Sequence, residues 1–380
     1  MVKSASISAL AALERAFTHK QPTLSGLRNF VLLQYPLALG TAIHATPFLA
    51  ALRAVLPDAH IAVAASGFAL EILRGNPNLD RLVETPSPIT DMRPAVRALR
   101  TAKFFPGKPF AALQTTGNER SRVAIAALRS GMHTRVGFTV APELSAAPLT
   151  YDPRISQIAN NLRLIEALGH GKTLLQRLQS HPNLLEPRVY PSPQDVATAR
   201  ALLRDQRIDE ARPIAVFITQ TSPTQRKSWR ADRFRIIAEW LDRDFGMQVV
   251  FVGSASESPA IERLQKSLSF RAANLAGRTS LLELAALLSV ADVALTLDTG
   301  PMHLARAVRL PMVIIAPAWS PEIEWLPLDN PRTRILKKAD LAAAPNDYII
   351  DEVTVEDVKE SLRDLLAAYP PRRFTWRLRS

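Results

Sequence analysis

The residues with the clearest chemical signal follow a short apolar strand in the last third of the chain. The strand Val293–Leu297 ends on Asp298, and a Thr-Gly-Pro turn at 299–301 comes next. A helix then begins at once and carries His303. In a strand–turn–helix unit of this kind, the free N–H groups and the dipole of the helix attract a phosphate group. The motif predicts a phosphate site, or alternatively an Asp-Gly turn in which the carboxylate caps a helix.

Charged residues follow two further predicted strands. Lys227 comes after a polar loop that follows the strand Ile214–Ile218, and Glu257 comes after the strand Gln248–Val252. A lysine at the end of a strand can neutralise a leaving diphosphate, and a carboxylate can accept both hydroxyls of a ribose. The alternatives are a solvated loop lysine and an ordinary glutamate in the first turn of a helix.

The elements that must position these residues alternate between strand and helix twice along the chain. Phe30–Gln34 is an uninterrupted apolar strand, which is typical of a parallel sheet covered on both faces. The pattern restarts after a proline-rich stretch at 182–193, which we interpret as a linker. We therefore predict an α/β protein with two doubly wound domains.

The predicted organisation has four parts, with a loop expected at 139–154 inside the second of them. Residues 4–17 have the apolar spacing of an amphipathic helix. The parts are a helical extension at 1–25, an N-terminal domain at 26–185, a C-terminal domain at 186–354, and a last helix with a basic tail at 355–380.

Composition narrows the class of protein. Of the 380 residues 47% are hydrophobic, none is cysteine, and no apolar run approaches the ~20 residues that cross a bilayer. Disulfides and thiolate metal sites are therefore excluded. The stretch Met1–Lys20 lacks the pattern of a signal peptide, because charged residues interrupt its apolar positions. We expect a cytoplasmic protein.

The net charge of +12 indicates an anionic partner, such as nucleic acid, anionic lipid or a phosphorylated substrate. No zinc-finger spacing, RNA-recognition motif or lysine tract is present, so nucleic acid is a minor alternative. A basic and aromatic tail suits the surface of an anionic membrane, and its alternative is a frayed, solvated end. The residues of this tail are Arg372, Arg373, Phe374, Trp376, Arg377 and Arg379.

Together these motifs resemble glycosyltransferase family 9, the ADP-heptose:lipopolysaccharide heptosyltransferases. The resemblance covers roughly residues 29–366 and rests on four blocks in the family's order. The blocks are Gly40–Pro47, then Lys227-Ser228-Trp229 with Asp232-Arg233-Phe234, then Gly253–Glu257, and finally Leu275–Ser280 with Asp298–His303.

The resemblance implies the GT-B architecture, in which two Rossmann-like domains face each other across a cleft and the last helix crosses back onto the first domain. It implies that the C-terminal domain holds the ADP part of a nucleotide-sugar donor and that no metal or other cofactor is required. The donor residues it implies, all matching the family's motifs in place, are Lys227, Glu257, Gly277, Asp298, Thr299, Gly300, Pro301 and His303. Beside a diphosphate, we expect Asp298 to accept hydrogen bonds or to orient the turn.

The N-terminal block departs from the family pattern. Gly40 and His44 agree with it, but Thr41 stands where the family has an aspartate that is the expected general base. A threonine hydroxyl does not accept a proton near neutral pH. Either His44 or Glu119, which follows the strand Phe110–Leu113, has taken over that role, or the protein binds a nucleotide sugar without transferring it.

These observations favour an inverting glycosyltransferase that moves a sugar, expected to be heptose, from an ADP-sugar to a lipid-linked or other cell-envelope saccharide. Its place would be the inner face of the plasma membrane, with peripheral contact through the basic tail. The alternatives are a catalytically weak nucleotide-sugar-binding homologue and a nucleotide-sugar epimerase on the same fold.

Overall fold

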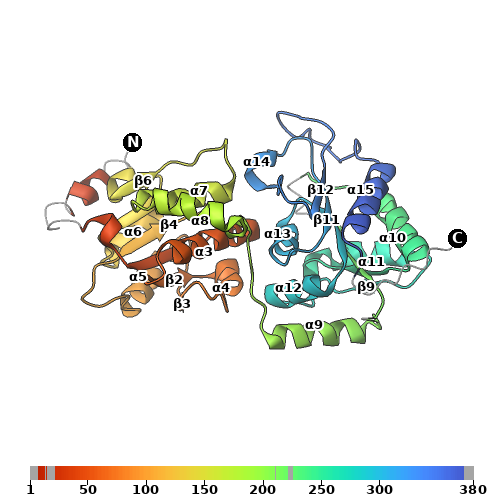
Figure 1. Cartoon of the computed structure of the whole chain (residues 1–380), viewed down its shortest axis with the longest axis horizontal. Helices are drawn as coiled ribbons and strands as arrows, with labels where there is room; N and C mark the ends of the chain where they lie inside the picture. Colours follow the sequence, from red (N-terminus) through yellow and green to blue (C-terminus); the bar gives the residue numbers. More distant parts are fainter. Residues whose placement is uncertain (1–6, 13, 15–21, 210, 221–225, 372–380) are drawn as a thin grey trace. The chain divides into compact units, whose positions relative to one another are not determined.

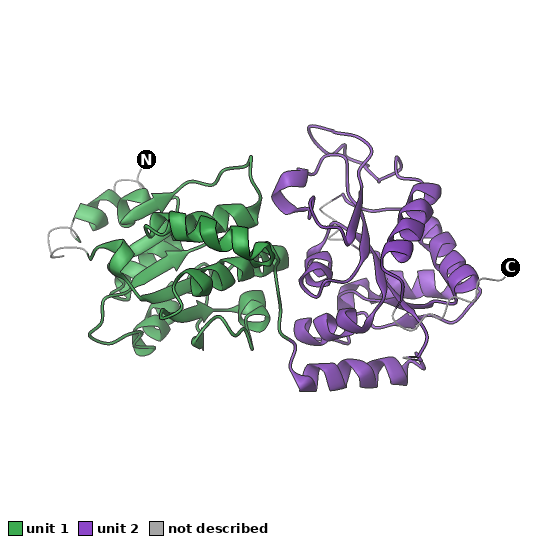
Figure 2. Ribbon diagram, viewed as in Figure 1, with its two compact units in different colours: residues 1–190 green, residues 191–380 purple. Residues whose placement is uncertain are grey.

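The chain folds into two units, and each is built around one parallel sheet (Figures 1 and 2). The computed structural model describes residues 7–12, 14, 22–209, 211–220 and 226–371. Unit 1 spans Met1–Tyr190 and unit 2 spans Pro191–Ser380, so the division falls within the proline-rich stretch. The predicted α/β class with two doubly wound sheets is confirmed.

The sheet of unit 1 has six parallel strands in the order β3-β2-β1-β4-β5-β6. Strand β1, in the interior of the sheet, is buried along its whole length, as its uninterrupted apolar run predicts. The strands are β1 (Asn29–Gln34), β2 (His60–Ala65), β3 (Arg81–Glu84), β4 (Ala111–Gln114), β5 (Arg135–Phe138) and β6 (Ala147–Leu149).

Helices cover both faces of this sheet, because alternate side chains of a strand point to opposite faces. Phe30 and Leu32 of β1 join one core with α3, α7 and α8, whereas Val31 and Leu33 join a second core with α5 and α6. The helices of unit 1 are η1 (Leu24–Gly26), α2 (Leu39–His44), α3 (Thr46–Val55), α4 (Gly67–Ile72), α5 (Met92–Thr101), α6 (Ser121–Arg129), η2 (Pro142–Leu144), α7 (Gln157–Ala167), α8 (Gly171–Ser180) and η3 (Pro182–Leu185).

The sheet of unit 2 repeats this arrangement, with the order β12-β11-β10-β7-β8-β9 and all pairs parallel. Its strands are β7 (Ile214–Ile218), β8 (Gln248–Phe251), β9 (Ala273–Asn274), β10 (Val293–Leu297), β11 (Met312–Ile315) and β12 (Thr333–Leu336). Its helices are α9 (Pro193–Asp205), α10 (Ala231–Phe245), η5 (Ala255–Glu257), α11 (Ser258–Lys266), α12 (Leu281–Val290), α13 (Gly300–Ala307), α14 (Glu322–Trp325) and α15 (Val355–Ala368).

The last helix, α15, corrects one expectation. We expected it to return to the N-terminal domain, but it packs on α10, β11 and β12 of unit 2. Val358, Leu362 and Leu365 recur at helical spacing and are fully buried in the core of unit 2. The apolar face of α15 is therefore buried within unit 2 itself.

Both sheets reverse their strand order at one place, between β1 and β4 in unit 1 and between β7 and β10 in unit 2. In doubly wound sheets, ligands bind beyond the carboxyl ends of the strands at such a reversal. We call the edge at which the strands end the carboxyl edge. The predicted site residues follow β1 and β4 in unit 1, and β7, β8, β9 and β10 in unit 2.

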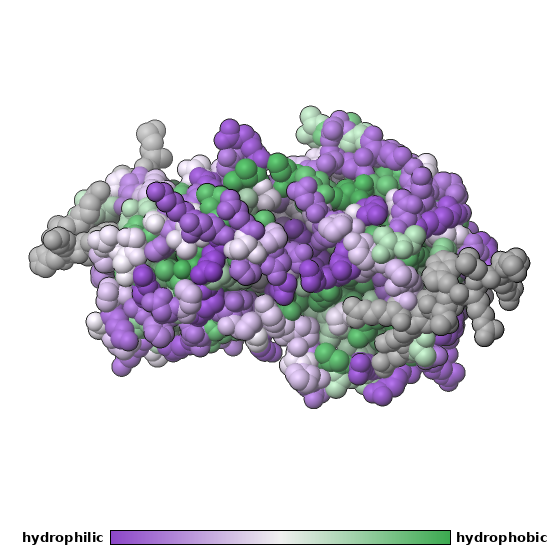
Figure 3. All heavy atoms as spheres, viewed as in Figure 1, coloured by the Kyte–Doolittle hydropathy of each residue, from purple (hydrophilic) through white to green (hydrophobic). Residues whose placement is uncertain are grey.

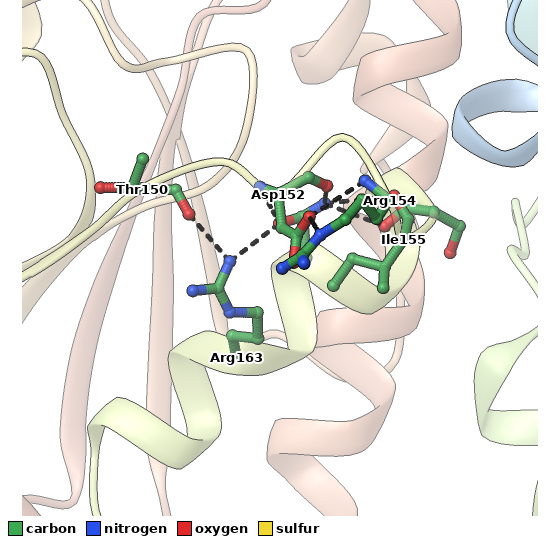
Figure 4. Close-up of polar contacts among 7 residues, drawn as sticks. Thr150, Asp152, Arg154, Ile155 and Arg163 are labelled. Atoms are coloured by element: carbon green, nitrogen blue, oxygen red, sulfur yellow. Dashed lines mark hydrogen bonds and ion pairs between the residues drawn. The ribbon is translucent and has the colours of Figure 1, made fainter.

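The stretch 139–154, predicted as a loop, contains η2 and the edge strand β6. After β6, the Arg154 guanidinium donates one hydrogen bond to each carboxylate oxygen of Asp152, both at 2.9 Å (Figure 4). The Asp152 backbone N–H donates to the side-chain oxygen of Asn160 in α7. The hydrogen bonds that the Asp152 carboxylate accepts from the Arg154 side chain and from the Arg154 backbone N–H lower the pKa of Asp152 to about 2. Three prolines in this stretch concealed the strand, because proline is tolerated at a sheet edge.

The surface and the chain ends add two observations. On the face shown in Figure 3, hydrophilic residues cover most of the surface and apolar residues form small patches. Among the described residues, no helix combines the length and the apolar character that crossing a membrane requires. The basic tail at 372–380 lies outside the described residues, as does part of the predicted helix at 4–17. Residues 7–12 of that helix are helical, and Ala11 belongs to a small apolar cluster that includes Ala124 of α6.

Candidate active site

The carboxyl edge of unit 2 holds a nearly buried ion pair. Lys227 follows β7 and Asp298 follows β10, and because these strands are neighbours their ends lie side by side. The Lys227 Nζ donates to Asp298 Oδ2 at 2.6 Å, with side chains only 13% and 4% exposed. A charge pair at this depth holds both side chains in one geometry. Asp298 accordingly acts here as an acceptor that positions the lysine.

The ion pair lies beside the N-terminus of α13. Thr299 precedes the helix in an extended conformation, and Gly300 and Pro301 form its first turn. The first N–H groups of a helix have no partner within it, so those of Thr299 and Gly300 are suited to an anionic ligand. The Thr299 hydroxyl oxygen is buried and has no hydrogen-bond partner among the described residues. A phosphate oxygen would satisfy these donors.

His303, one turn further along α13, is a neutral side chain. It is 4% exposed, and its ring lies 6.1 Å from that of Trp325. Burial lowers the pKa of His303 from 6.5 to about 4, and nearby Asp298 only partly opposes this shift. At neutral pH the imidazole therefore offers a hydrogen bond but no positive charge.

This pKa predicts a pH dependence of stability. Between pH 6.5 and 4 the unfolded chain binds a proton at His303 that the folded chain does not, so stability falls as the pH falls. We expect His303→Gln to remove about 2 to 3 kcal/mol of the loss between pH 7 and pH 4.5. Urea unfolding at several pH values measures this, with exposed His181→Gln as the control. Equal pH dependence in wild type and His303→Gln would contradict the assignment.

Two residues of this edge were missed by sequence reasoning. Ser320 Oγ donates to Asp298 Oδ2 at 3.3 Å, and the Trp319 ring centroid lies 5.3 Å from Lys227 Nζ. Both belong to the loop that follows β11, the strand next to β10. The signal was available: in a parallel sheet, the loop after the next strand reaches the same carboxyl edge.

The Arg226 side chain, beside Lys227 in the sequence, is directed elsewhere. Its guanidinium donates to the carbonyls of Ala344 and Pro345, at 2.9 and 3.2 Å. Its own carbonyl accepts from the Trp319 indole at 3.1 Å. Arg226 therefore anchors its loop, and Lys227 alone of the two pairs with Asp298.

Glu257 and Gly277 lie together on the other side of the reversal point, after β8 and β9. The Gly277 N–H donates to the Gly253 carbonyl at 2.8 Å, and a Cβ atom on Gly277 would come 2.6 Å from the backbone of Ala255. The Glu257 carboxylate accepts from the Ser254 N–H at 2.6 Å and caps η5. Glu257 thus has the helix-capping role in the structure, with its side chain still partly exposed.

In unit 1, Thr41 and Glu119 both lie against Gly117, in the turn that follows β4. Thr41 lies in α2, and a Cβ atom on Gly117 would overlap its side chain. The Gly117 N–H in turn donates to Glu119 Oε1 at 2.8 Å. Gly117 has a φ of +79°, a conformation that favours glycine. A carboxylate from the loop after β4 therefore lies beside the position at which the expected aspartate is missing.

His44 is placed in the core rather than at the edge. It is 1% exposed, its Nδ1 lies 3.1 Å from Gln157 Oε1, and its carbonyl accepts from Asn161 of α7. Gly40, also in α2, is buried as well. Of the two replacements considered for the general base, the geometry favours Glu119, and His44 packs α2 against α7. Within the described part of the chain, no group of three or more His, Asp or Glu side chains forms a possible metal site.

With this geometry in view, the chain can be compared with known proteins. Residues 187–343 match the model of glycosyltransferase family 9 (heptosyltransferase), and they include every residue that we predicted for the donor site. This stretch, which makes up most of unit 2, is similar to glycosyltransferase family 9. The family resemblance seen in its motifs is thereby confirmed.

Two named proteins are similar to the chain over part of its length. The chain is 28% identical over 215 residues to lipooligosaccharide heptosyltransferase 2 of Haemophilus influenzae. The aligned stretch covers 53% of this chain and 61% of that protein. It is 26% identical over 215 residues to lipopolysaccharide heptosyltransferase 2 of Salmonella typhimurium, covering 53% and 60%. The chain thus spans about three fifths of the length of these relatives.

Solved structures extend the likeness to both units. A family 9 glycosyl transferase from Veillonella parvula has a TM-score of 0.77 at 18% identity, covering 92% of this chain and all of that one. The ADP-heptose lipopolysaccharide heptosyltransferase II of Escherichia coli has a TM-score of 0.72 at 21% identity, covering 89% and 98%. At these identities the likeness shows the fold, and it confirms the GT-B fold class.

Proposed function

We propose that this chain is an inverting glycosyltransferase that moves a sugar, heptose by analogy with the named relatives, from an ADP-sugar to a lipopolysaccharide-core or other cell-envelope saccharide. One observation carries the proposal: Lys227 is held by Asp298 at the N-terminus of α13. A fixed cation and a helix N-terminus together form a site for a diphosphate.

On the donor side, the diphosphate occupies the N–H groups of Thr299 and Gly300 and the ammonium of Lys227. As the bond from the anomeric carbon to the diphosphate oxygen breaks, its electron pair passes to that oxygen. Lys227 and the helix dipole stabilise the developing negative charge. The nucleoside lies toward Glu257 and Gly277, whose loops end the neighbouring strands β8 and β9.

On the acceptor side, the Glu119 carboxylate takes the proton from the acceptor hydroxyl, whose oxygen attacks the anomeric carbon opposite the leaving diphosphate. Attack from that side inverts the anomeric centre. The Gly117 N–H orients the Glu119 carboxylate, and the Thr41 methyl group packs against the same glycine. Gly40, Thr41 and the buried His44 shape this wall of the acceptor site from α2.

No metal enters this scheme, because the cation and the helix dipole supply the charge stabilisation. The acceptor is expected to be lipid-linked. Peripheral contact with an anionic membrane through the basic tail from Arg372 onward remains a prediction about residues outside the described part of the chain. The net charge of +12 is consistent with that contact and with a phosphorylated donor.

A second candidate function is favoured by Thr41. A family 9 protein without a carboxylate on α2 binds a nucleotide sugar and transfers it poorly if Glu119 does not replace that group. Turnover with a bound donor separates the two functions.

The test supplies the full chain with ADP-heptose and a heptose-deficient lipopolysaccharide core, and follows released ADP and acceptor mass. We expect stoichiometric release of ADP, a gain of one heptose per acceptor, and unchanged turnover in EDTA. Binding of ADP-heptose in calorimetry without a mass gain would establish the second candidate instead. If neither ADP nor ADP-heptose binds, both candidates fail.

A further inference from the structure

A cavity of about 420 Å³ opens at the carboxyl edge of unit 2, next to the Lys227–Asp298 pair. Two segments form it: residues 318–323, which run from the end of β11 into the first residues of α14, and residues 337–341, which follow β12. The Leu341 N–H donates to the Ala318 carbonyl at 3.0 Å and ties these loops together. A volume of this size is within the range of small-molecule sites.

The charged side chains that line the cavity are two carboxylates and one lysine between them. The Lys337 side chain is only 7% exposed, and its ammonium pairs with Asp340 and lies 3.5 Å from Glu322 Oε1. The Glu322 and Asp340 side chains are 42% and 90% exposed. The buried Lys337 ammonium therefore positions both carboxylates. The acceptor positions of these carboxylates that Lys337 does not occupy are open to a ligand with hydroxyl groups.

Two residues, Trp319 and Ser320, line the cavity and also contact the proposed phosphate site. Trp319 lines the cavity, and its ring centroid lies 5.3 Å from Lys227 Nζ. The Trp319 indole N–H donates to the Arg226 carbonyl, which fixes the orientation of the ring. Ser320 also lines the cavity and donates to Asp298. A group attached to a phosphate at Lys227 therefore lies directly beside this cavity.

The strand order gives a direction to a bound donor. Along the carboxyl edge, the loops after β9 and β8 come first, then those after β7 and β10, and then those after β11 and β12. If the nucleoside lies at Glu257 and Gly277 and the diphosphate at Lys227 and Thr299, the third part of the donor continues toward β11 and β12. That part is the sugar.

We propose that the cavity is the subsite that receives the sugar of the donor and that Glu322 and Asp340 select its hydroxyl pattern. The carboxylates accept hydrogen bonds from the sugar hydroxyls, and an apolar C–H face of the sugar packs on the Trp319 ring. The inference rests on the proposed donor function, since it assigns the end of the same ligand. It adds the residues that distinguish one ADP-sugar from another.

The test compares the affinity for ADP with that for ADP-heptose in the full chain, by calorimetry. We expect Glu322→Gln to leave ADP affinity within about twofold of wild type and to weaken ADP-heptose binding about tenfold, because a carboxylate accepts stronger hydrogen bonds than an amide. Asp340→Asn, on a highly exposed side chain, is expected to act in the same direction. The control is Asp329→Asn, which removes an exposed carboxylate from the loop between α14 and β12.

The outcomes separate the subsite from the function on which it rests. A wild type that binds ADP and ADP-heptose, combined with variants that weaken neither or weaken both equally, overturns the subsite and leaves the donor function standing. A wild type that binds neither nucleotide overturns the donor function and the subsite together. Thermal unfolding of each variant excludes misfolding as the cause, and both substitutions lie on partly or highly exposed side chains.

Discussion

Glu119→Gln is expected to lower the rate of sugar transfer about 10²- to 10⁴-fold, the usual contribution of a general base, and to leave ADP affinity unchanged. The amide keeps the size of the side chain and can still accept a hydrogen bond from the Gly117 N–H, so the turn is preserved. What is lost is the ability to take a proton. The measurement is kcat with ADP-heptose at saturating acceptor, compared with the affinity for ADP alone.

The control is Asp58→Asn, which removes one carboxylate before β2, at the opposite edge of the same sheet. Its expected effect on kcat is small. Thr41→Asp supplies the converse test, since it restores a carboxylate on α2 beside the same turn. If Glu119 is the base, Thr41→Asp adds little to the wild type and restores part of the activity lost in Glu119→Gln. A large gain from Thr41→Asp in the wild-type background would contradict the role of Glu119.

The second large effect is expected at Lys227. Lys227→Ala should weaken ADP binding by about 1 to 3 kcal/mol and lower kcat by about 10² to 10³, since in the proposed function the lysine contacts the diphosphate and stabilises it as it leaves. Calorimetry with ADP and the transfer rate measure the two effects. Lys266→Ala at the exposed end of α11 removes the same charge and is the control.

This substitution also leaves Asp298 without its cation, at a side chain that is 4% exposed. Breaking a buried pair from one side costs about 3 to 5 kcal/mol of stability, so Lys227→Ala alone does not separate folding from binding. The double variant Lys227→Ala/Asp298→Asn removes both charges and is expected to regain stability without regaining ADP affinity. If the double variant binds ADP as tightly as wild type, Lys227 has only a structural role.

Much of the fold could be predicted from local patterns. The strands β7 and β10 and the helices α12 and α15 follow from apolar runs, capping residues and turn residues that are neighbours in the sequence. The same holds for the strand–turn–helix unit at Asp298, because a helix N-terminus attracts an anion through its own N–H groups. Where the local signal is weak, as in β6 and β12 at the sheet edges, the prediction missed the strand.

The sequence by itself therefore determined the two doubly wound units, the strand–turn–helix unit at Thr299 and Gly300 that we propose as a phosphate site, and the absence of an aspartate at position 41. Only the tertiary structure decided which side chains meet there. It placed Glu119 beside Thr41 through Gly117, and it placed Ser320 against Asp298. The physical reason is that parallel strands are joined by long crossovers, so residues that share a carboxyl edge are far apart in the chain. Local pattern predicts each strand end, but the order of the strands decides which ends are neighbours.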